Sequence, residues 1–256
     1  MVFATVCIGE DRRSDTMHLL HDLRNLDYKV FLYTNIDFDF ERFQFSNVHV
    51  IKTEEKVWND FQRFIPIKTA FELTNDEFVY YLDCDSRFFN FRDEKFDKNK
   101  FEQLLVSKNF DIMSPHELDP VITQLNPPNP NEDKNIRQYH FGFESVIQYL
   151  KSKNLNYDND VLRGSPLETV LLFRKSDKMI LFLEELLNFS KLLIHEEEKI
   201  GRKHVAPGCG FAMRLLSGVY GLNIVINGIV CHFFKGNFLR EVFPFNFKIW
   251  KEEKIF

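Results

Sequence analysis

The chain has few of the features that mark zinc-binding, nucleic-acid-binding or membrane-spanning proteins. Its four cysteines are far apart and form no CxxC pair, so we expect no zinc site. The formal net charge of −5 argues against a large basic face for nucleic-acid phosphates. No stretch comes near the roughly 18 uncharged apolar residues of a membrane helix. The acidic Glu10 and Asp11 also follow the apolar start too soon for a signal peptide. We therefore expect a cytoplasmic protein with no integral membrane segment.

Two of the cysteines, Cys7 and Cys84, lie inside apolar runs. They predict buried free thiols, which suit the reducing cytosol.

Short apolar runs rich in β-branched and aromatic residues alternate with segments of helical spacing along the first half of the chain. The runs predict strands at 2–8, 29–34, 49–51, 78–82, 110–113, 169–173, 223–226 and 229–233, the last two joined at Asn227-Gly228. Helices are predicted after an N-cap at Ser14, over 58–73 with a break at Pro66, and over 98–108, 177–198 and 211–217. This order predicts an α/β fold with a mixed, mostly parallel sheet flanked by helices, in a single domain over 1–256.

The region between Pro115 and His140 is polar and rich in proline and asparagine. A segment this long without apolar periodicity predicts a flexible loop that covers a ligand, or else disorder.

Two aspartates, Asp83 and Asp85, directly follow the strongest strand signal of the chain, Phe78 to Leu82. Hard cations such as Mn²⁺ and Mg²⁺ prefer oxygen ligands, and both side chains can reach one ion once the strand has ended. In open α/β sheets, ligands collect beyond the carboxyl ends of the strands. The pair therefore predicts a divalent-metal site for a diphosphate, although two aspartates that merely solvate a strand end would give the same pattern.

The segment from Lys68-Thr69-Ala70 to Val79–Asp85 resembles the Lys-x-x-Ala…YLDxD stretch of GT-A glycosyltransferases. It is similar to glycosyltransferase family 8, the glycogenin and lipopolysaccharide galactosyltransferase group, and to family 6, the blood-group transferase group. The resemblance implies a GT-A, Rossmann-like fold with a nucleotide-binding half at 1–113 and an acceptor-side half at 114–256. It implies transfer of a sugar from a nucleotide-sugar, by default a UDP-sugar, to a glycan, protein or modified-base acceptor.

The same resemblance implies roles for residues of the first half. Asp83 would contact the metal and the ribose, and Asp85 would bind the metal. The N-terminal strand would cradle the base at Ala4, Thr5 and Val6. Lys68 would meet the nucleotide, although a solvent-facing helix lysine accounts for it equally well.

In the second half, His232 and Lys235 partly match the His-x-x-Gly-x-x-Lys segment of family 8, which implies a third metal ligand and a phosphate contact. The segment 163–173 resembles the stretch where such families enter an internal strand, which makes Glu168 the candidate for the side chain near the anomeric carbon, although a carboxylate at a strand edge accounts for it equally well. Residues 207–212 contain no acid where both families carry one, so retaining and inverting outcomes both stay open.

Two other hypotheses compete with that of a sugar transferase. A haloacid-dehalogenase-like phosphatase would use Asp83 as nucleophile, but its motif belongs near the N-terminus and needs a late acidic pair. A catalytically silent nucleotide-sugar-binding protein would keep the fold without the activity.

Overall fold

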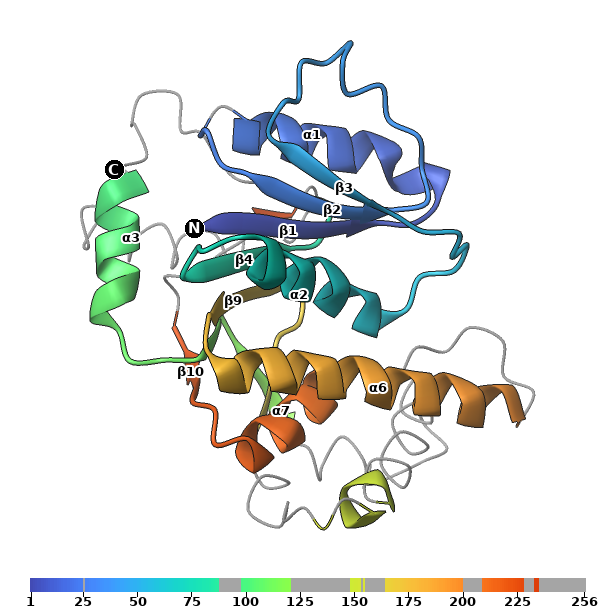
Figure 1. The fold of residues 1–256 in the computed structure, drawn as a ribbon, viewed down its shortest axis with the longest axis vertical. Coiled ribbons are helices and arrows are strands. Elements are labelled where there is room, and N and C mark those ends of the chain that lie inside the picture. The colour runs from blue at the N-terminus through green and yellow to red at the C-terminus, as the bar shows by residue number, and fades with distance from the viewer. Residues whose placement is uncertain are drawn as a thin grey trace.

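The computed structural model describes residues 1–24, 26–87, 98–120, 148–152, 154, 164–199, 209–227 and 233–234. Its main element is a seven-stranded sheet in the order β10-β6-β9-β4-β1-β2-β3. Helices flank this sheet (Figure 1). The predicted α/β class with a mixed, mostly parallel sheet is confirmed.

Four strands form the parallel part of the sheet: β1 (Val2–Cys7), β2 (Val30–Thr34), β3 (Val48–Lys52) and β4 (Phe78–Leu82). Every residue of β1, β2 and β4 is buried, which explains why these strands are continuous apolar runs rather than alternating ones. Because the four strands run the same way, their carboxyl ends meet at one edge of the sheet.

The rest of the sheet comes from later in the chain. β9 (Val170–Arg174) runs antiparallel between β4 and β6 (Ile112–Ser114), and β10 (Ile224–Ile226) pairs in parallel with β6. The second half of the chain thus places a strand inside the sheet that the first half begins.

Alternate residues of the central strands divide the core between the two faces of the sheet. Val2, Ala4 and Val6 pack in one cluster with residues of α2 (Phe64–Leu73), α6 (Asp177–Lys199) and α7 (Cys209–Val219). Phe3 and Cys7 pack in the other cluster with α1 (Arg13–Arg24) and α3 (Lys98–Ser107). This is the period-two burial expected for a strand covered on both sides.

Two helix starts differ from the prediction. A 3-10 turn, η1 (Glu10–Arg12), leads into α1 at Arg13, so Ser14 lies inside the helix and is not its N-cap. A second 3-10 turn, η2 (Asp60–Arg63), precedes α2, so the break falls before Pro66. Pro66 lies in the first turn of α2, where its missing N–H costs nothing.

Two small ribbons lie outside the main sheet. β5 (Ser86–Arg87) pairs with β11 (Phe233–Phe234), and β7 (Glu117–Pro120) pairs with β8 (Gly164–Pro166). Part of the expected loop at 115–140 is therefore a strand, whereas 121–140 lies outside the described residues. Of the predicted final pair of strands, β10 pairs in parallel with β6, and Phe233, at the end of the second, pairs with β5; residues 228–232 lie outside the described part of the chain.

Cys7, Cys84 and Cys209 are free thiols; Cys7 and Cys209 are buried, and Cys84 is half-buried. None of the helices within the described part of the chain combines the length and apolar character needed to cross a membrane.

Candidate active site at the carboxyl edge of the sheet

The site is built where the parallel strands end. After β1, Gly9 takes a φ of +95°, a conformation that favours glycine, and its N–H donates to Asn35 Oδ1 at 3.1 Å. The chain then turns into η1, which carries Arg12 toward the end of β4. Loops that follow β1, β2, β3 and β4 therefore share one edge, as ligand sites of open α/β sheets do.

Asp83 is the first residue after β4, and it is held from several sides. Its N–H donates to the carbonyl of Thr169 at 3.0 Å, and its Oδ1 accepts from the Tyr81 hydroxyl at 2.6 Å. Its side chain is 20% exposed. Burial raises the pKa of Asp83 to about 6, while Arg63 and the Tyr81 hydroxyl act to lower it.

Asp85 lies two residues on, in a turn closed by the N–H of Ser86, which donates to the Asp83 carbonyl at 2.9 Å. Its side chain is 36% exposed, and Arg12 Nη1 donates to its Oδ2 at 3.2 Å. The turn thus presents two carboxylates near each other at the surface of the edge.

Arg63, the last residue of η2, is the buried cation of the site. Its side chain is only 4% exposed, yet three carboxylates surround it: Asp60 at 3.3 Å, Glu168 at 3.7 Å and Asp83 at 3.9 Å. Among the described residues, its Nε and Nη1 have no hydrogen-bond partner. A buried cation with unsatisfied N–H groups is costly, and such costs are typical of functional sites.

Glu168 reaches this cluster through the sheet register. β9 pairs Val170 with Leu82, so the residues just before β9 lie beside those just after β4. The backbone N–H of Gly210, near the start of α7, donates to Glu168 Oε1. Burial raises the pKa of Glu168 to about 7, against the lowering effect of Arg63.

Gly210 is required for this contact. A Cβ at this position would lie 2.5 Å from Glu168 Oε1 and 2.9 Å from the carbonyl oxygen of Pro166. The resembled families carry an acidic residue in the segment that matches 207–212, whereas this chain has none. Here the backbone N–H of Gly210 binds the carboxylate of Glu168, which comes from a different segment.

The other predicted residues lie in different surroundings. Ala4, Thr5 and Val6 are buried within β1, at 0%, 1% and 3% exposure. Lys68 pairs with Glu72 one turn along α2. His232 and Lys235 lie outside the described residues, although β11, between them in sequence, pairs with the strand that follows Asp85.

Sequence reasoning missed Asp60 and Arg63. Both lie in the segment that reads as a kinked helix, where an i,i+3 pair of opposite charges interrupts apolar residues. This pair of charges among apolar residues could have indicated a buried site, because charged side chains on an otherwise apolar face are buried only with partners.

The donor set of Asp83 and Asp85 fits a divalent cation shared with a ligand. Over the described part of the chain, no cluster of three or more His, Cys, Asp or Glu residues could hold a metal alone. Mg²⁺ is commonly held by one or two carboxylates together with substrate phosphates and water, so two aspartates suffice if a diphosphate supplies further oxygens.

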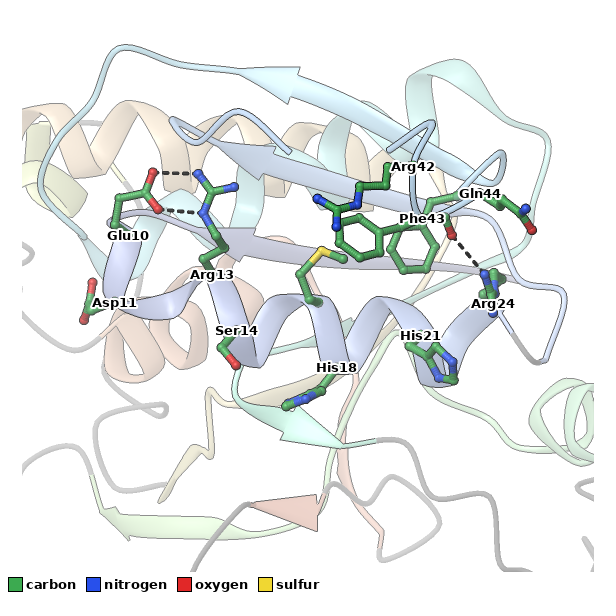
Figure 2. Close-up of a pocket in the computed structure, with 12 residues that line it drawn as sticks. Glu10, Asp11, Arg13, Ser14, His18, His21, Arg24, Arg42, Phe43 and Gln44 are labelled. Carbon is green, nitrogen blue, oxygen red and sulfur yellow. Dashed lines mark hydrogen bonds and ion pairs between the residues drawn. The ribbon is translucent and has the colours of Figure 1, made fainter. Parts of the chain in front are cut away.

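A separate cavity of about 760 Å³ lies along α1 and the segment at 42–45 (Figure 2). Glu10 and Arg13 pair at one end, and Arg24 donates to the Phe43 carbonyl at the other. Its lining includes neither Asp83 nor Asp85, so it is not part of the carboxylate site.

Comparisons with known proteins give a distant structural likeness. No protein-family model and no curated protein sequence matches the chain. Among solved structures, the chain is similar to the apo structure of WbbM, described as a bifunctional glycosyltransferase, with a TM-score of 0.42 and 11% identity. The match covers 90% of this chain and 39% of that one, so this chain spans well under half the length of WbbM.

Proposed function

We propose that the protein is a divalent-metal-dependent glycosyltransferase of the GT-A type, which transfers a sugar from a nucleotide-sugar to a glycan, protein or modified-base acceptor. The observation that carries the proposal is the Asp83–Asp85 turn at the carboxyl end of a central strand. There, two partly exposed carboxylates lie beside a third, Glu168, that a buried arginine links to Asp83. The resemblance of the Lys68–Asp85 segment to families 8 and 6 supports the same assignment.

Asp83 and Asp85 would hold Mn²⁺ or Mg²⁺ against the diphosphate of the donor. A cation held there would supply positive charge to the nucleoside diphosphate that leaves when the sugar is transferred. Asp83 is suited to this role because Thr169 and Tyr81 fix its orientation before any ligand binds. His232 and Lys235 remain our candidates for a third metal ligand and a phosphate contact.

Glu168 would act on the sugar. Its carboxyl is held by the Gly210 N–H and faces the guanidinium of Arg63, so its position does not depend on the ligand. With a pKa of about 7, it exists in both protonation states near neutrality. It can therefore accept a hydrogen bond from a sugar or acceptor hydroxyl, or support positive charge at the anomeric carbon.

The proposal is tested by thermal unfolding with UDP, GDP or CMP, each with and without Mn²⁺. A nucleoside diphosphate at one hundred times its Kd stabilises the folded state by about 2.7 kcal/mol. We expect this gain only when both the nucleotide and Mn²⁺ are present. The Asp83→Ala/Asp85→Ala variant should lose it.

A matched control removes the same charge elsewhere. Glu41 and Glu184 are exposed residues of the 38–45 segment and α6, so the Glu41→Ala/Glu184→Ala variant should keep the metal-dependent gain. Equal stabilisation of the Asp83/Asp85 variant and the parent would refute the proposed site.

The same preparations separate the competing functions. Slow hydrolysis of the nucleotide-sugar that binds indicates a transferase, whereas binding without hydrolysis indicates a silent protein. Hydrolysis of p-nitrophenyl phosphate that Asp83→Asn abolishes would indicate a phosphatase instead.

A further inference from the structure

Trp58 is a partly exposed aromatic side chain beside the candidate active site. It precedes η2 in the loop that follows β3, and its side chain is 36% exposed. Single exposed apolar side chains are common on protein surfaces, so exposure alone does not indicate a role. The contacts that fix this ring are what set it apart.

The indole is held by residues of the carboxylate cluster itself. Its Nε1–H donates to Asp60 Oδ1 at 3.1 Å, and the Arg63 guanidinium lies 5.5 Å from the ring centre. Apart from this N–H, which already has a partner, the indole ring is hydrocarbon. The ring therefore offers an apolar surface in a fixed orientation.

The loop that carries Trp58 is also tied down. Asn59 and Gln62 form a capping box at the start of η2, and Gln62 Nε2 donates to the carbonyl of Val57 at 3.2 Å. Residues on both sides of Trp58 are thus hydrogen-bonded to η2. A ring on such a loop can bind a ligand without first losing conformational freedom.

Arg63 connects this ring to the proposed reaction centre. The same guanidinium that lies against the indole is 3.9 Å from Asp83 and 3.7 Å from Glu168. A ligand whose diphosphate binds at Asp83 would therefore lie close to Arg63 and to the indole that Arg63 contacts.

We infer that Trp58 binds the apolar face of a sugar ring; this inference rests on the proposed glycosyl transfer. The carboxylates around Trp58 and Arg63 favour a sugar over a nucleobase. Asp60, which bonds to the indole N–H, and Glu168, which lies 3.7 Å from Arg63, are hydrogen-bond acceptors that suit the hydroxyl groups around a pyranose. The carbonyl oxygens of a pyrimidine are also acceptors, so these carboxylates would repel them.

The sugar can belong to the donor or to the acceptor, and fluorescence distinguishes the two. The chain has two tryptophans, Trp58 and Trp250, so a Trp250→Phe protein reports on Trp58 alone. It is titrated in Mg²⁺ with UDP, GDP, UDP-glucose, UDP-galactose, GDP-mannose, and methyl glucoside or methyl galactoside with and without UDP. Isothermal calorimetry measures binding of each nucleotide in parallel.

A change in Trp58 emission with a nucleotide-sugar but not with its nucleotide supports a donor sugar. A change with a methyl glycoside supports an acceptor sugar. A full change with UDP or GDP alone overturns the inference in favour of base stacking, and no change with any probe overturns it outright. If calorimetry finds no nucleotide binding, the proposed function fails, and the methyl glycosides alone then decide the role of Trp58.

Variants give an independent measure. Trp58→Ala should raise the Kd of the bound sugar-containing probe about three- to tenfold, the effect of one aromatic contact, and leave the Kd of the nucleotide within about twofold. Trp58→Phe should restore most of the affinity, and Val57→Ala, an exposed neighbour, should change neither value. Equal weakening of nucleotide and nucleotide-sugar by Trp58→Ala would show a merely structural role and contradict the inference.

Discussion

Replacing Arg63 by methionine tests whether this buried cation supports the three carboxylates around it. Methionine keeps much of the side-chain volume but removes the charge. Arg63 is 4% exposed and lies within 4 Å of Asp60, Asp83 and Glu168. Removing one partner of a buried ion pair costs about 3–5 kcal/mol when the remaining charge stays buried.

The cost should depend on pH, because it arises only when the carboxylates are charged. In the parent, burial raises the pKa of Asp83 to about 6 and of Glu168 to about 7, while Arg63 opposes both shifts. Without Arg63 both values rise further. A carboxyl whose folded pKa lies above its unfolded value contributes stability at low pH that is lost as pH rises through the folded pKa.

We therefore expect Arg63→Met to lose about 1 kcal/mol or less at about pH 5, and about 3–5 kcal/mol at about pH 8. Urea denaturation followed by circular dichroism at the two pH values measures the difference. Arg174→Met is the matched control. Arg174 donates to the carbonyls of Leu105 and Lys108 and lies 3.2 Å from the exposed Glu77, so its loss should be similar at both pH values.

A loss for Arg63→Met that is the same at both pH values would refute the reasoning. It would mean that Arg63 acts through packing alone.

Three further predictions concern the surroundings of this cluster. Gly210→Ala should destabilise the protein by about 1–3 kcal/mol in thermal unfolding, because the new Cβ would contact Glu168 and the Pro166 carbonyl; an unchanged Tm would contradict the close approach. The parent should lose stability between about pH 5 and pH 8 because the pKa of Glu168 is raised to about 7, and Glu168→Gln should make that loss smaller by about 2 kcal/mol; the same loss in both proteins would argue against this assignment. Arg12→Ala should change stability by no more than about 0.5 kcal/mol, because the Arg12–Asp85 pair is exposed; a larger loss in urea denaturation would show that the pair is structural.

The sequence was sufficient to predict the strands of the sheet and the aspartate pair. The buried strands are continuous apolar runs, and β4 ends where Asp83 begins, so local pattern alone places both. The partners of Asp83 could not be predicted in this way. Glu168 comes beside Asp83 only through the antiparallel pairing of β9 with β4, a contact between segments far apart in the chain.

Two errors have local physical causes. The segment at 58–73 has helical spacing throughout, but the Asn59–Gln62 capping box starts a 3-10 turn, and α2 begins only at Phe64. The pair Asn227-Gly228 is typical of a hairpin turn, but β10 pairs in parallel with β6, and Phe233, at the end of the predicted partner strand, pairs with β5. In both cases tertiary pairing or capping outweighed the pattern within a short window.

The position of β9 has a consequence for how the chain folds. During synthesis β4 emerges long before its neighbour β9, so one side of β4 has no partner until the second half of the chain is made. The ion pair of Glu168 with Arg63 cannot form before that insertion. Insertion of β9 and assembly of the carboxylate cluster are therefore the same late event, and a chain cut short before Val170 would expose the strand edge on which the aspartate pair is built.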